Sequence, residues 1–264
     1  MRFNKRMKLY VINLDRSKDR LEHISNIFKE QNLEFTRVSA VDGRALPQKE
    51  FEELTKERNW SKALTPTEVG CFLSHRECLR LIAQSDDPYG AIFEDDIIMS
   101  PHASSFLKDW NWIPDGTDIV KIDTAEIPCV VGPTSQKLEN GYHLAPLLNK
   151  HYCTGGYIVS RDCAQKLYIL TSQVSAPIDE FYFNPDCGVM QTLKIEQMIP
   201  AITIQDNLES TIQQPKDDTK KHKASNRSFI QKLNREWKRF EKKTFWPWRM
   251  KTFHGCFWGK IPFK

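Results

Sequence analysis

The order of elements at the start of the chain limits the fold more than any other feature of this sequence. Residues 8–14 (KLYVINL) form a short apolar run that ends in polar residues, as buried strands do. Residues 16–32 follow with one apolar helical face, and Ser17 stands where a helix cap is expected. Residues 33–43 have the pattern of a second strand, ended by an Asp-Gly pair. This order predicts an α/β sheet. The helical face consists of Leu21, Ile24, Ile27 and Phe28.

The clearest local signal lies in residues 64–85 (LTPTEVGCFLSHRECLRLIAQS). Thr65 at the cap, Pro66 at the first helical position and Glu68 three residues after the cap make a capping box. A short apolar run at 89–93 (YGAIF) then predicts another strand. The remaining predicted elements are strands at 118–123, 142–148, 156–160 and 201–205, and a helix over 161–171 with Ser160 as its cap.

Three consecutive acids, Glu94, Asp95 and Asp96, come directly after the strand predicted at 89–93. Residues 91–100 contain no Lys or Arg, so the repulsion among the acids calls for a cation or a shared proton. Mg²⁺ and Mn²⁺ are bound by oxygen ligands, commonly one or two carboxylates plus substrate phosphates. Since residues two apart on an extended segment point the same way, Glu94 and Asp96 are predicted to meet one ligand. The alternative is a solvated acidic turn.

The segment VINLDRSKDR joins the first predicted strand to the first predicted helix, a place where nucleotides bind in α/β proteins. Asn13 and nearby backbone groups are candidates for pairing with a base, and Arg16 or Arg20 for meeting phosphate. The alternative for both arginines is an ion pair with Asp19 or Glu22 on the helix face. The chain has neither the glycine fingerprint of a dinucleotide-binding fold nor a P-loop.

Three further groups of residues are weaker candidates. Ser74 and His75 lie inside the capped helix, where a single histidine is more often structural than functional. Two consecutive glycines in YCTGGY (152–157) allow either the close approach of a ligand or a simple turn. Asp179 and Glu180 follow a proline, so either is a candidate base or an ordinary acid at a helix start.

Charge divides the chain into an acidic body and a basic end. The net charge is +4, but residues 216–264 carry 15 Lys and Arg against 4 Asp and Glu, and the rest carries 23 against 30. Residues 213–226 have the composition of a flexible linker. Residues 227–264 combine a basic helical face with many aromatic residues, which favours binding to an anionic membrane surface. Nucleic-acid binding and docking on the chain's own domain are the alternatives. The apolar side of that helix would be Ile230, Leu233, Trp237 and Phe240.

The seven cysteines are irregularly spaced and contain no C-x-x-C pair, which argues against a disulfide framework and against a structural zinc site. No run of about 18 apolar residues exists, so no membrane-spanning helix is predicted. The first residues lack the pattern of a secretory signal peptide. A cytosolic protein is therefore expected.

Several of these segments together resemble glycosyltransferase family 25, the group that includes bacterial lipooligosaccharide glycosyltransferases. Its motifs are matched, in the expected order, by VINLDRSKDR, AVDG, TEVGCFLSH, IFEDDI and TGGYIVS, and more weakly by PID and STI. The matches span about residues 8–212, and the basic end is not part of them. TEVGCFLSH together with EDD is the most specific combination.

The resemblance implies a GT-A type fold, that is, a Rossmann-like mixed sheet flanked by helices, with a nucleotide-sugar donor and inversion at the anomeric carbon. It makes the acidic triplet the counterpart of the D-x-D metal motif of such enzymes, with Asp96 and Glu94 holding Mn²⁺ or Mg²⁺ against the donor diphosphate. The first acid here is Glu, so Asp96 is preferred as the direct ligand. The implied base is Asp179, with Asp123 as the second candidate. The implied donor-binding residues are Asn13, Leu14, Arg16, Arg20, Asp42, Ser74, His75, Glu94, Asp95, Thr154, Gly155 and Gly156.

The sequence thus predicts a glycosyltransferase domain over 1–212, a linker over 213–226 and a basic membrane-associating helical tail over 227–264. The expected reaction moves a hexose, with galactose from UDP-galactose as the family-level choice, to a lipooligosaccharide or LPS core acceptor. The expected location is the cytoplasmic face of a bacterial inner membrane. Two other functions remain open at this point: a metal-dependent phosphohydrolase, and a non-catalytic adaptor that binds membranes.

Overall fold

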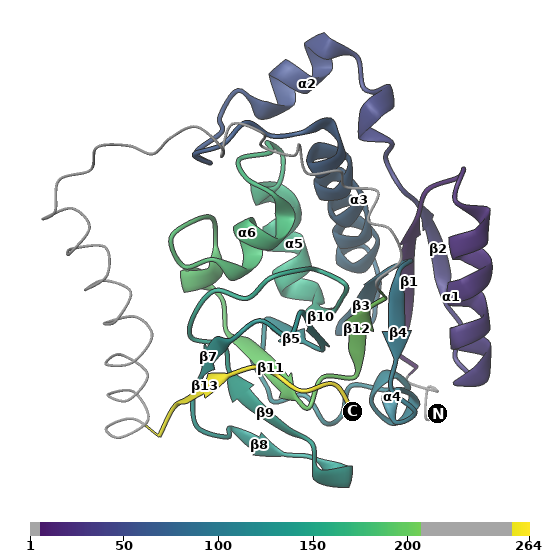
Figure 1. Ribbon diagram of the computed structural model, residues 1–264, viewed down its shortest axis with the longest axis vertical. Coiled ribbons are helices and arrows are strands. Elements are labelled where there is room, and N and C mark those ends of the chain that lie inside the picture. The colour runs from purple at the N-terminus through teal and green to yellow at the C-terminus, as the bar shows by residue number, and fades with distance from the viewer. Residues whose placement is uncertain (1–5, 207–254) are drawn as a thin grey trace, which may run out of the picture.

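One mixed sheet of eight strands forms the centre of the computed structural model, which describes residues 6–206 and 255–264 (Figure 1). In spatial order its strands are β2 (Thr36–Ser39), β1 (Lys8–Asn13), β3 (Tyr89–Glu94), β10 (Gly156–Ser160), β5 (Ile119–Lys121), β11 (Ile195–Ile199), β9 (His143–Pro146) and β8 (Gln136–Lys137). β1 lies parallel to both of its neighbours. β10 runs antiparallel to β3 and β5, β11 is parallel to β5, and β9 is antiparallel to β11 and β8.

Helices cover both faces of this sheet, and neighbouring residues of one strand show which helices lie on which face. Val11 of β1 belongs to the same buried cluster as Phe28, whereas Ile12 belongs to the cluster that contains Phe72. Because side chains alternate along a strand, the two clusters are the two faces of the sheet. The three-layer arrangement confirms the predicted α/β class. The first face is covered by α1 (Lys18–Glu30) and α4 (Ala103–Leu107), the second by α3 (Pro66–Ala83), α5 (Arg161–Leu170) and α6 (Ile178–Phe183).

Two of the three predicted helix caps are confirmed. The Thr65 hydroxyl accepts a hydrogen bond from the Glu68 N–H (3.2 Å), and the Glu68 carboxylate accepts one from the Thr65 N–H (2.7 Å), so α3 begins with a full capping box. The Ser160 hydroxyl caps α5 by accepting from the Cys163 N–H. Ser17 occupies the cap position of α1, but its side chain makes no capping hydrogen bond.

A small second sheet brings a late part of the chain beside the acidic triplet. It consists of β4 (Ile97–Met99), β12 (Thr203–Gln205) and β6 (Asp123–Thr124), with β12 in the centre. The Asp206 N–H, just after β12, donates to the Asp96 carbonyl oxygen (2.7 Å). Residues far apart in sequence therefore meet at the end of β3.

The last residues of the chain pack against the domain, which corrects part of the predicted tail. β13 (Phe257–Gly259) pairs antiparallel with β7 (Cys129–Val131), as the yellow strand in Figure 1 shows. Ile261 is fully buried, and its carbonyl oxygen accepts a hydrogen bond from the Thr124 hydroxyl (2.8 Å). The prediction of a separate tail is therefore wrong for residues 255–264. The predicted linker, the STI match and the predicted amphipathic helix lie outside the described residues.

The remaining elements are short or lie at the edge of the fold. No disulfide joins any of the seven cysteines, all of which lie in the described residues. Within residues 6–206 and 255–264, no helix is both long and apolar enough to cross a membrane. These remaining elements are α2 (Gln48–Thr55) and the 3₁₀ turns Gly43–Ala45, Glu139–Gly141 and Met190–Thr192.

Candidate functional site

A cleft opens at the carboxyl ends of the parallel strands β1 and β3, where ligands bind in open α/β sheets. One wall is formed by the loop after β1 and by the segment that follows β2. The other walls are the first turns of α3, the acidic triplet and the end of β12. The lining residues are Ile12, Leu14, Arg16, Arg20, Ala40, Val41, Asp42, Gly43, Thr67, Cys71, Ser74, Glu94, Asp95, Asp96 and Gln205.

The two arginines of VINLDRSKDR both face this cleft. Arg16 forms an ion pair with Asp42, and both side chains are partly exposed. Arg20 Nη1 lies 3.1 Å from Asp95 Oδ1 and 3.4 Å from Asp96 Oδ2. Two guanidinium groups therefore stand at one edge of the sheet, each paired with an acid of the cleft, and guanidinium is well suited to binding phosphate.

Asn13 has a structural role that differs from its predicted contact with a base. Its side chain is 1% exposed. The amide nitrogen donates to Asp95 Oδ2 (2.6 Å) and to the Ser17 carbonyl (3.0 Å), while the amide oxygen accepts from Arg37 Nε (3.0 Å). All of its hydrogen-bonding groups are thus used within the protein, and Asn13 orients Asp95.

Glu94, the first acid of the triplet, turns toward α3 and β12. Its Oε1 accepts hydrogen bonds from the Thr154 hydroxyl (2.6 Å) and lies 3.3 Å from His75 Nε2, while its Oε2 accepts from Gln205 Nε2 (3.1 Å). Burial alone would raise the pKa of Glu94, but His75 and the Thr154 hydroxyl bring it below its ordinary value. Glu94 is therefore a well-supported, ionised carboxylate.

Asp96 is the acid with a free coordination position. Its Oδ1 is buried and has no hydrogen-bond partner. Burial, and then the nearby charge of Glu94, raise the pKa of Asp96 to about 7. A divalent cation at Oδ1 would supply the missing partner and remove the cost of the buried charge, so the residues present fit a metal through Asp96. The three acids do not converge on one point: in the described part of the chain, the one group of at least three potential ligands within 4.8 Å of one another is Cys71, His75 and Glu94.

Two glycines allow α3 to contact the AVDG segment, which forms a wall of the cleft. A Cβ atom on Gly43 would lie 1.6 Å from the Pro66 carbonyl oxygen, and one on Gly70 would lie 2.5 Å from the Val41 carbonyl oxygen. The Ser74 hydroxyl joins the same two segments, since it accepts from the Val41 N–H (2.9 Å) and donates to the Gly70 carbonyl (2.6 Å). Ser74 lines the cleft, but its hydroxyl is used to hold the wall in place.

The TGG segment supports the acidic triplet from behind and does not line the cleft. The Thr154 hydroxyl bonds Glu94, and the Gly155 carbonyl accepts from the Glu94 N–H (3.1 Å). A Cβ atom on Gly156 would lie 2.5 Å from Thr203 Oγ1, so this glycine allows β12 to approach β10. The close approach predicted for a ligand is thus made at Gly156 by the chain itself.

The two candidate bases differ in access. Asp123 is 1% exposed and forms an ion pair with Lys121 Nζ (2.5 Å). Asp179, at the start of α6, is partly exposed and accepts hydrogen bonds from the N–H groups of Glu180 (2.9 Å) and Cys153 (3.4 Å). Burial raises the pKa of both carboxyls. Burial, then the charge of Glu94 and then that of Asp179 raise the pKa of the Cys71 thiol, so Asp179 lies near this lining residue.

The structure brings eight of the predicted residues to the cleft and adds others. Cys71 and Thr67 were missed although they lie one and two turns before Ser74 and His75 on the same helix. Gln205 was missed although it ends a predicted strand, which is a usual position for ligand contacts. The predicted residues that line the cleft are Leu14, Arg16, Arg20, Asp42, Ser74, Glu94, Asp95 and Asp96. The predicted residues that do not line it are Asn13, His75, Thr154, Gly155, Gly156, Asp123 and Asp179.

Curated relatives of this chain are bacterial and animal glycosyltransferases. The lacto-N-neotetraose biosynthesis glycosyltransferase LgtB of Neisseria gonorrhoeae is 27% identical over 211 residues, which cover 76% of this chain and 75% of LgtB. The lipooligosaccharide biosynthesis protein lic2B of Haemophilus influenzae is 30% identical over 66% of this chain and 69% of its own length. Procollagen galactosyltransferase 1-A of Xenopus laevis is 28% identical over 66% of this chain and 30% of its own length.

The family comparison agrees with these relatives and with the resemblance of the motifs. The sequence model of glycosyltransferase family 25 (LPS biosynthesis protein) matches residues 7–182, which include β1, α3, the acidic triplet and most of α6. The match covers more than half of the chain and every residue that lines the cleft except Gln205. This chain belongs to glycosyltransferase family 25.

Proposed function

We propose that this glycosyltransferase moves galactose from UDP-galactose to a lipooligosaccharide or LPS core acceptor, with inversion at the anomeric carbon, on a GT-A type fold. The names of LgtB and lic2B support the acceptor class, and that of the procollagen galactosyltransferase supports the sugar. The observation that carries the proposal is the cleft, where two arginines and a carboxylate with an unpaired oxygen meet at the carboxyl ends of β1 and β3. Family membership favours this reaction over the phosphohydrolase and adaptor alternatives.

In this proposal the donor diphosphate takes the arginines from their present partners. Arg16 and Arg20 each pair with acids of the cleft, so a diphosphate would replace one anionic partner by another. Asp42, released from Arg16, would accept hydrogen bonds from donor hydroxyl groups. Leu14, between the strand and the arginines, gives the donor an apolar contact.

The metal of the proposed reaction, Mn²⁺ or Mg²⁺, would be held by Asp96 with Glu94 beside it. A bound ion of this kind neutralises negative charge on a diphosphate leaving group. Asp96 contributes the unpaired Oδ1, whereas Glu94 is oriented by Thr154 and Gln205. Asp95, bonded to Asn13 and Arg20, holds the triplet in place.

Asp179 is the proposed base. The acceptor hydroxyl oxygen attacks the anomeric carbon, its proton passes to the Asp179 carboxylate, and the bond from the sugar to the diphosphate breaks. The raised pKa of Asp179 makes it a stronger base than an exposed aspartate, and two N–H groups fix its orientation. Asp123 lacks comparable access because it is buried and paired with Lys121.

The base is tested by comparing Asp179→Asn with Asp123→Asn. We expect Asp179→Asn to keep donor binding and to lower kcat by about 10²- to 10⁴-fold, the usual contribution of a general base. Full activity of Asp179→Asn together with an inactive, folded Asp123→Asn would exchange the two roles. Activity in both variants would exclude both as the base.

The reaction itself is tested with a panel of nucleotide sugars in the presence of Mn²⁺, measured as released nucleoside diphosphate. Release should be highest with UDP-galactose and should depend on an oligosaccharide acceptor. EDTA should stop it reversibly, and Asp96→Ala should abolish it without loss of the fold. Near wild-type turnover by purified Asp96→Ala would refute the metal role. Release of inorganic phosphate without any acceptor would favour a phosphohydrolase, and a lack of nucleotide-sugar binding would favour an adaptor.

We further propose that the predicted basic tail, residues 227–264, holds the enzyme on the cytoplasmic face of the inner membrane and does not serve nucleic-acid binding. Each Lys or Arg near an anionic surface contributes about 1 kcal/mol. Because residues 256–264 pack on the domain, the test should change charges and leave the chain end intact. Replacing six basic residues by Gln should reduce co-sedimentation with anionic vesicles, whereas Gln at Lys18, Lys29 and Lys49 should not. Equal co-sedimentation of both variants would refute the proposal. The six residues are Lys232, Arg235, Lys238, Arg239, Lys242 and Lys243.

A further inference from the structure

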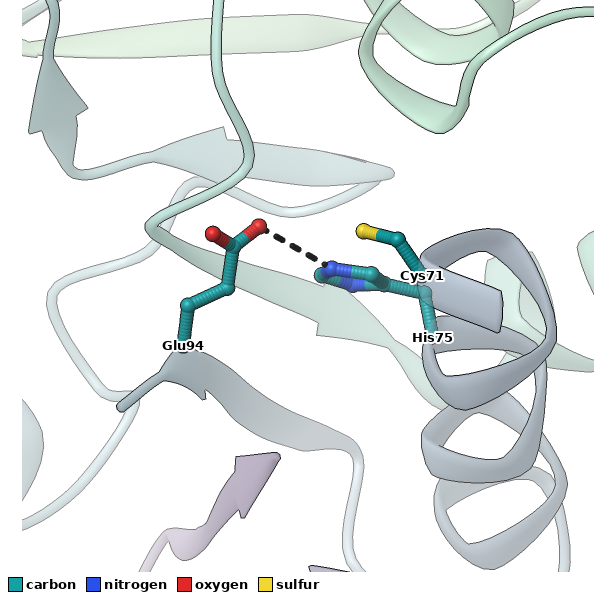
Figure 2. A group of neighbouring side chains, drawn as sticks. All are labelled: Cys71, His75 and Glu94. Carbon is teal, nitrogen blue, oxygen red and sulfur yellow. Dashed lines mark hydrogen bonds and ion pairs between the residues drawn. The ribbon is translucent and has the colours of Figure 1, made fainter. Parts of the chain in front are cut away.

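Three side chains with different ligand atoms meet at one wall of the cleft (Figure 2). Cys71 and His75 are four residues apart on α3, so they lie on one face of the helix and point toward the end of β3. There they face Glu94. The Cys71 sulfur, a His75 ring nitrogen and a Glu94 oxygen all lie within 4.8 Å of one another.

The His75 ring is held in an orientation suited to a metal ligand. Its Nδ1 lies 3.0 Å from the Tyr157 hydroxyl, and the two rings are stacked with their centroids 5.7 Å apart. Both side chains are fully buried. Nε2 faces Glu94 Oε1, and a metal at Nε2 would replace this contact while Nδ1 donates to the Tyr157 hydroxyl. Metal-bound histidines usually have their other ring nitrogen hydrogen-bonded in this way.

The Glu94 carboxylate is likewise held in one orientation by hydrogen bonds. The Thr154 hydroxyl bonds Oε1 and the Gln205 amide bonds Oε2, so the carboxylate cannot rotate freely. Its Oε1 lies 3.3 Å from His75 Nε2. Nitrogen and oxygen ligands of a tetrahedral Zn²⁺ ion, at about 2.0 to 2.1 Å from the metal, lie about 3.3 to 3.4 Å apart. These two ligands already have the separation that such an ion requires, and the Cys71 sulfur, within 4.8 Å of both, is the candidate for the third position.

The ligand set indicates the class of cation. Thiolate and imidazole favour Zn²⁺ and similar thiophilic ions, whereas Mg²⁺ and Mn²⁺ prefer oxygen. The surroundings are anionic, since the charges of Asp179 and Asp96 also act on Cys71. Cys71 lines the cleft and is partly exposed, so an ion can enter from solvent, and a water molecule can fill the fourth position. Such an open, three-ligand site differs from the closed structural zinc site that the cysteine spacing argues against.

We propose that Cys71, His75 and Glu94 bind a thiophilic divalent cation, with Zn²⁺ as the best fit, at a site separate from the unpaired oxygen of Asp96. On binding, the thiol releases its proton to solvent and the thiolate becomes a ligand. The ion would engage Glu94 and stand beside the acids of the donor cleft. As a consequence that rests on the proposed function, micromolar Zn²⁺ should inhibit sugar transfer at a fixed Mn²⁺ concentration.

Binding is tested on the full chain with Co²⁺ as a spectroscopic probe and Zn²⁺ as its competitor, without any nucleotide sugar. Folded wild-type protein should bind one Co²⁺ with a thiolate charge-transfer band, and Zn²⁺ should remove that band. Cys71→Ser should lose the band and bind Zn²⁺ at least 10-fold more weakly. Cys187→Ser, which removes another partly exposed thiol, should retain both properties. His75→Gln, checked for folding by circular dichroism, should change the position of the band because one ligand is replaced.

The proposal is overturned if wild-type protein shows no charge-transfer band, or if Cys71→Ser and Cys187→Ser bind Zn²⁺ equally. A second measurement addresses the consequence: the fraction of transfer lost on adding Zn²⁺, relative to each protein's own rate, should be smaller in Cys71→Ser than in Cys187→Ser. Equal fractions would refute inhibition through this site. If the chain transfers no sugar at all, the proposed function fails, while the Co²⁺ titration still decides whether the site exists.

Discussion

Two carboxylates in this protein have the same kind of partner and different surroundings. Asp123 lies 2.5 Å from Lys121 Nζ, and the two side chains are 1% and 0% exposed. Asp96 lies 3.4 Å from Arg20 Nη1 at the cleft, where the two side chains are 15% and 13% exposed. In each carboxylate one buried oxygen, Asp123 Oδ2 or Asp96 Oδ1, has no hydrogen-bond partner. Burial raises the pKa of both acids.

The two ion pairs differ in the further contacts that their cations, Lys121 and Arg20, make. Lys121 also donates to the Cys153 carbonyl (2.7 Å) and lies 4.3 Å from the centre of the Phe183 ring, so it ties β5 to the segment before β10 and to α6. Arg20 contacts two carboxylates at longer distances beside an open cleft. A buried pair with several further contacts stabilises positions within the fold, whereas a looser pair at a cleft can exchange its partner for a ligand.

The largest change in unfolding free energy is expected when the buried ion pair of Lys121 and Asp123 is broken. Lys121→Met removes the cation and leaves Asp123 buried without a counter-charge, which should cost about 3 to 5 kcal/mol of unfolding free energy. For a domain of this size, that corresponds to a decrease in Tm of about 10 °C. Thermal unfolding followed by circular dichroism measures it. An unchanged Tm would show that Asp123 is not held by this pair.

The second predicted effect is a gain in unfolding free energy at the cleft carboxylate, and its size depends on pH. Asp96 has a pKa of about 7 in the folded protein and an ordinary pKa of 3.8. The folded state therefore binds the Asp96 proton more tightly than the unfolded state does. Protonation of Asp96 stabilises the folded state at low pH, and this contribution is lost as the pH rises from the ordinary pKa toward 7. In metal-free protein, Asp96→Asn should raise the unfolding free energy by about 2 to 4 kcal/mol at pH 8, and by less at pH 5.

Urea unfolding at the two pH values, with EDTA present, measures this difference. Asp123→Asn serves as the matched control, because it leaves Lys121 buried without its partner and should lower stability at both pH values. If Asp96→Asn is less stable than the parent protein at pH 8, then the Arg20 pair outweighs the burial of Asp96 and the contrast between the two carboxylates fails.

The smallest effect is expected when the cation at the cleft is removed. Arg20→Met should cost only about 1 kcal/mol of stability, because Asp96 can take up a proton and Asp95 keeps its bond from Asn13. Its KM for the nucleotide sugar should rise about 10-fold, which is equivalent to about 1.4 kcal/mol of lost donor binding. A loss of stability as large as that of Lys121→Met would remove the distinction between the two pairs.

The fold was predictable wherever the signal was local. The alternation of strand and helix in residues 8–43 and the capping box at Thr65 depend on neighbouring residues, and both are confirmed. β11 was missed because its sequence, IEQMI, places Glu196 and Gln197 in a central strand, and this hides the apolar pattern of a buried strand. Glu196 is tolerated there since it accepts a hydrogen bond from Ser135, 61 residues away in sequence.

The site was predictable in composition and less so in geometry. The acids and arginines of the cleft belong to motifs that the sequence displays, yet the pairing of Arg20 with Asp95 joins residues 75 apart. The hydrogen bonds of the Asn13 side chain with Arg37 and Asp95 likewise form only in the folded sheet. Such contacts leave no periodic signal, because they depend on which strands become neighbours. The same reason explains β13, whose three residues, FWG, gave no sign that they pair with β7.

The docking of the chain end has a topological consequence. Asp206 is fixed beside Asp96, and residues 256–264 are fixed on β7, Thr124 and Ala201, so the intervening segment closes a ring with the domain. One cut within that segment would separate the covalent chain without removing β13, which would remain as a noncovalent fragment. A peptide of residues 255–264 should therefore complement a chain that ends at residue 206, in the manner of a split protein.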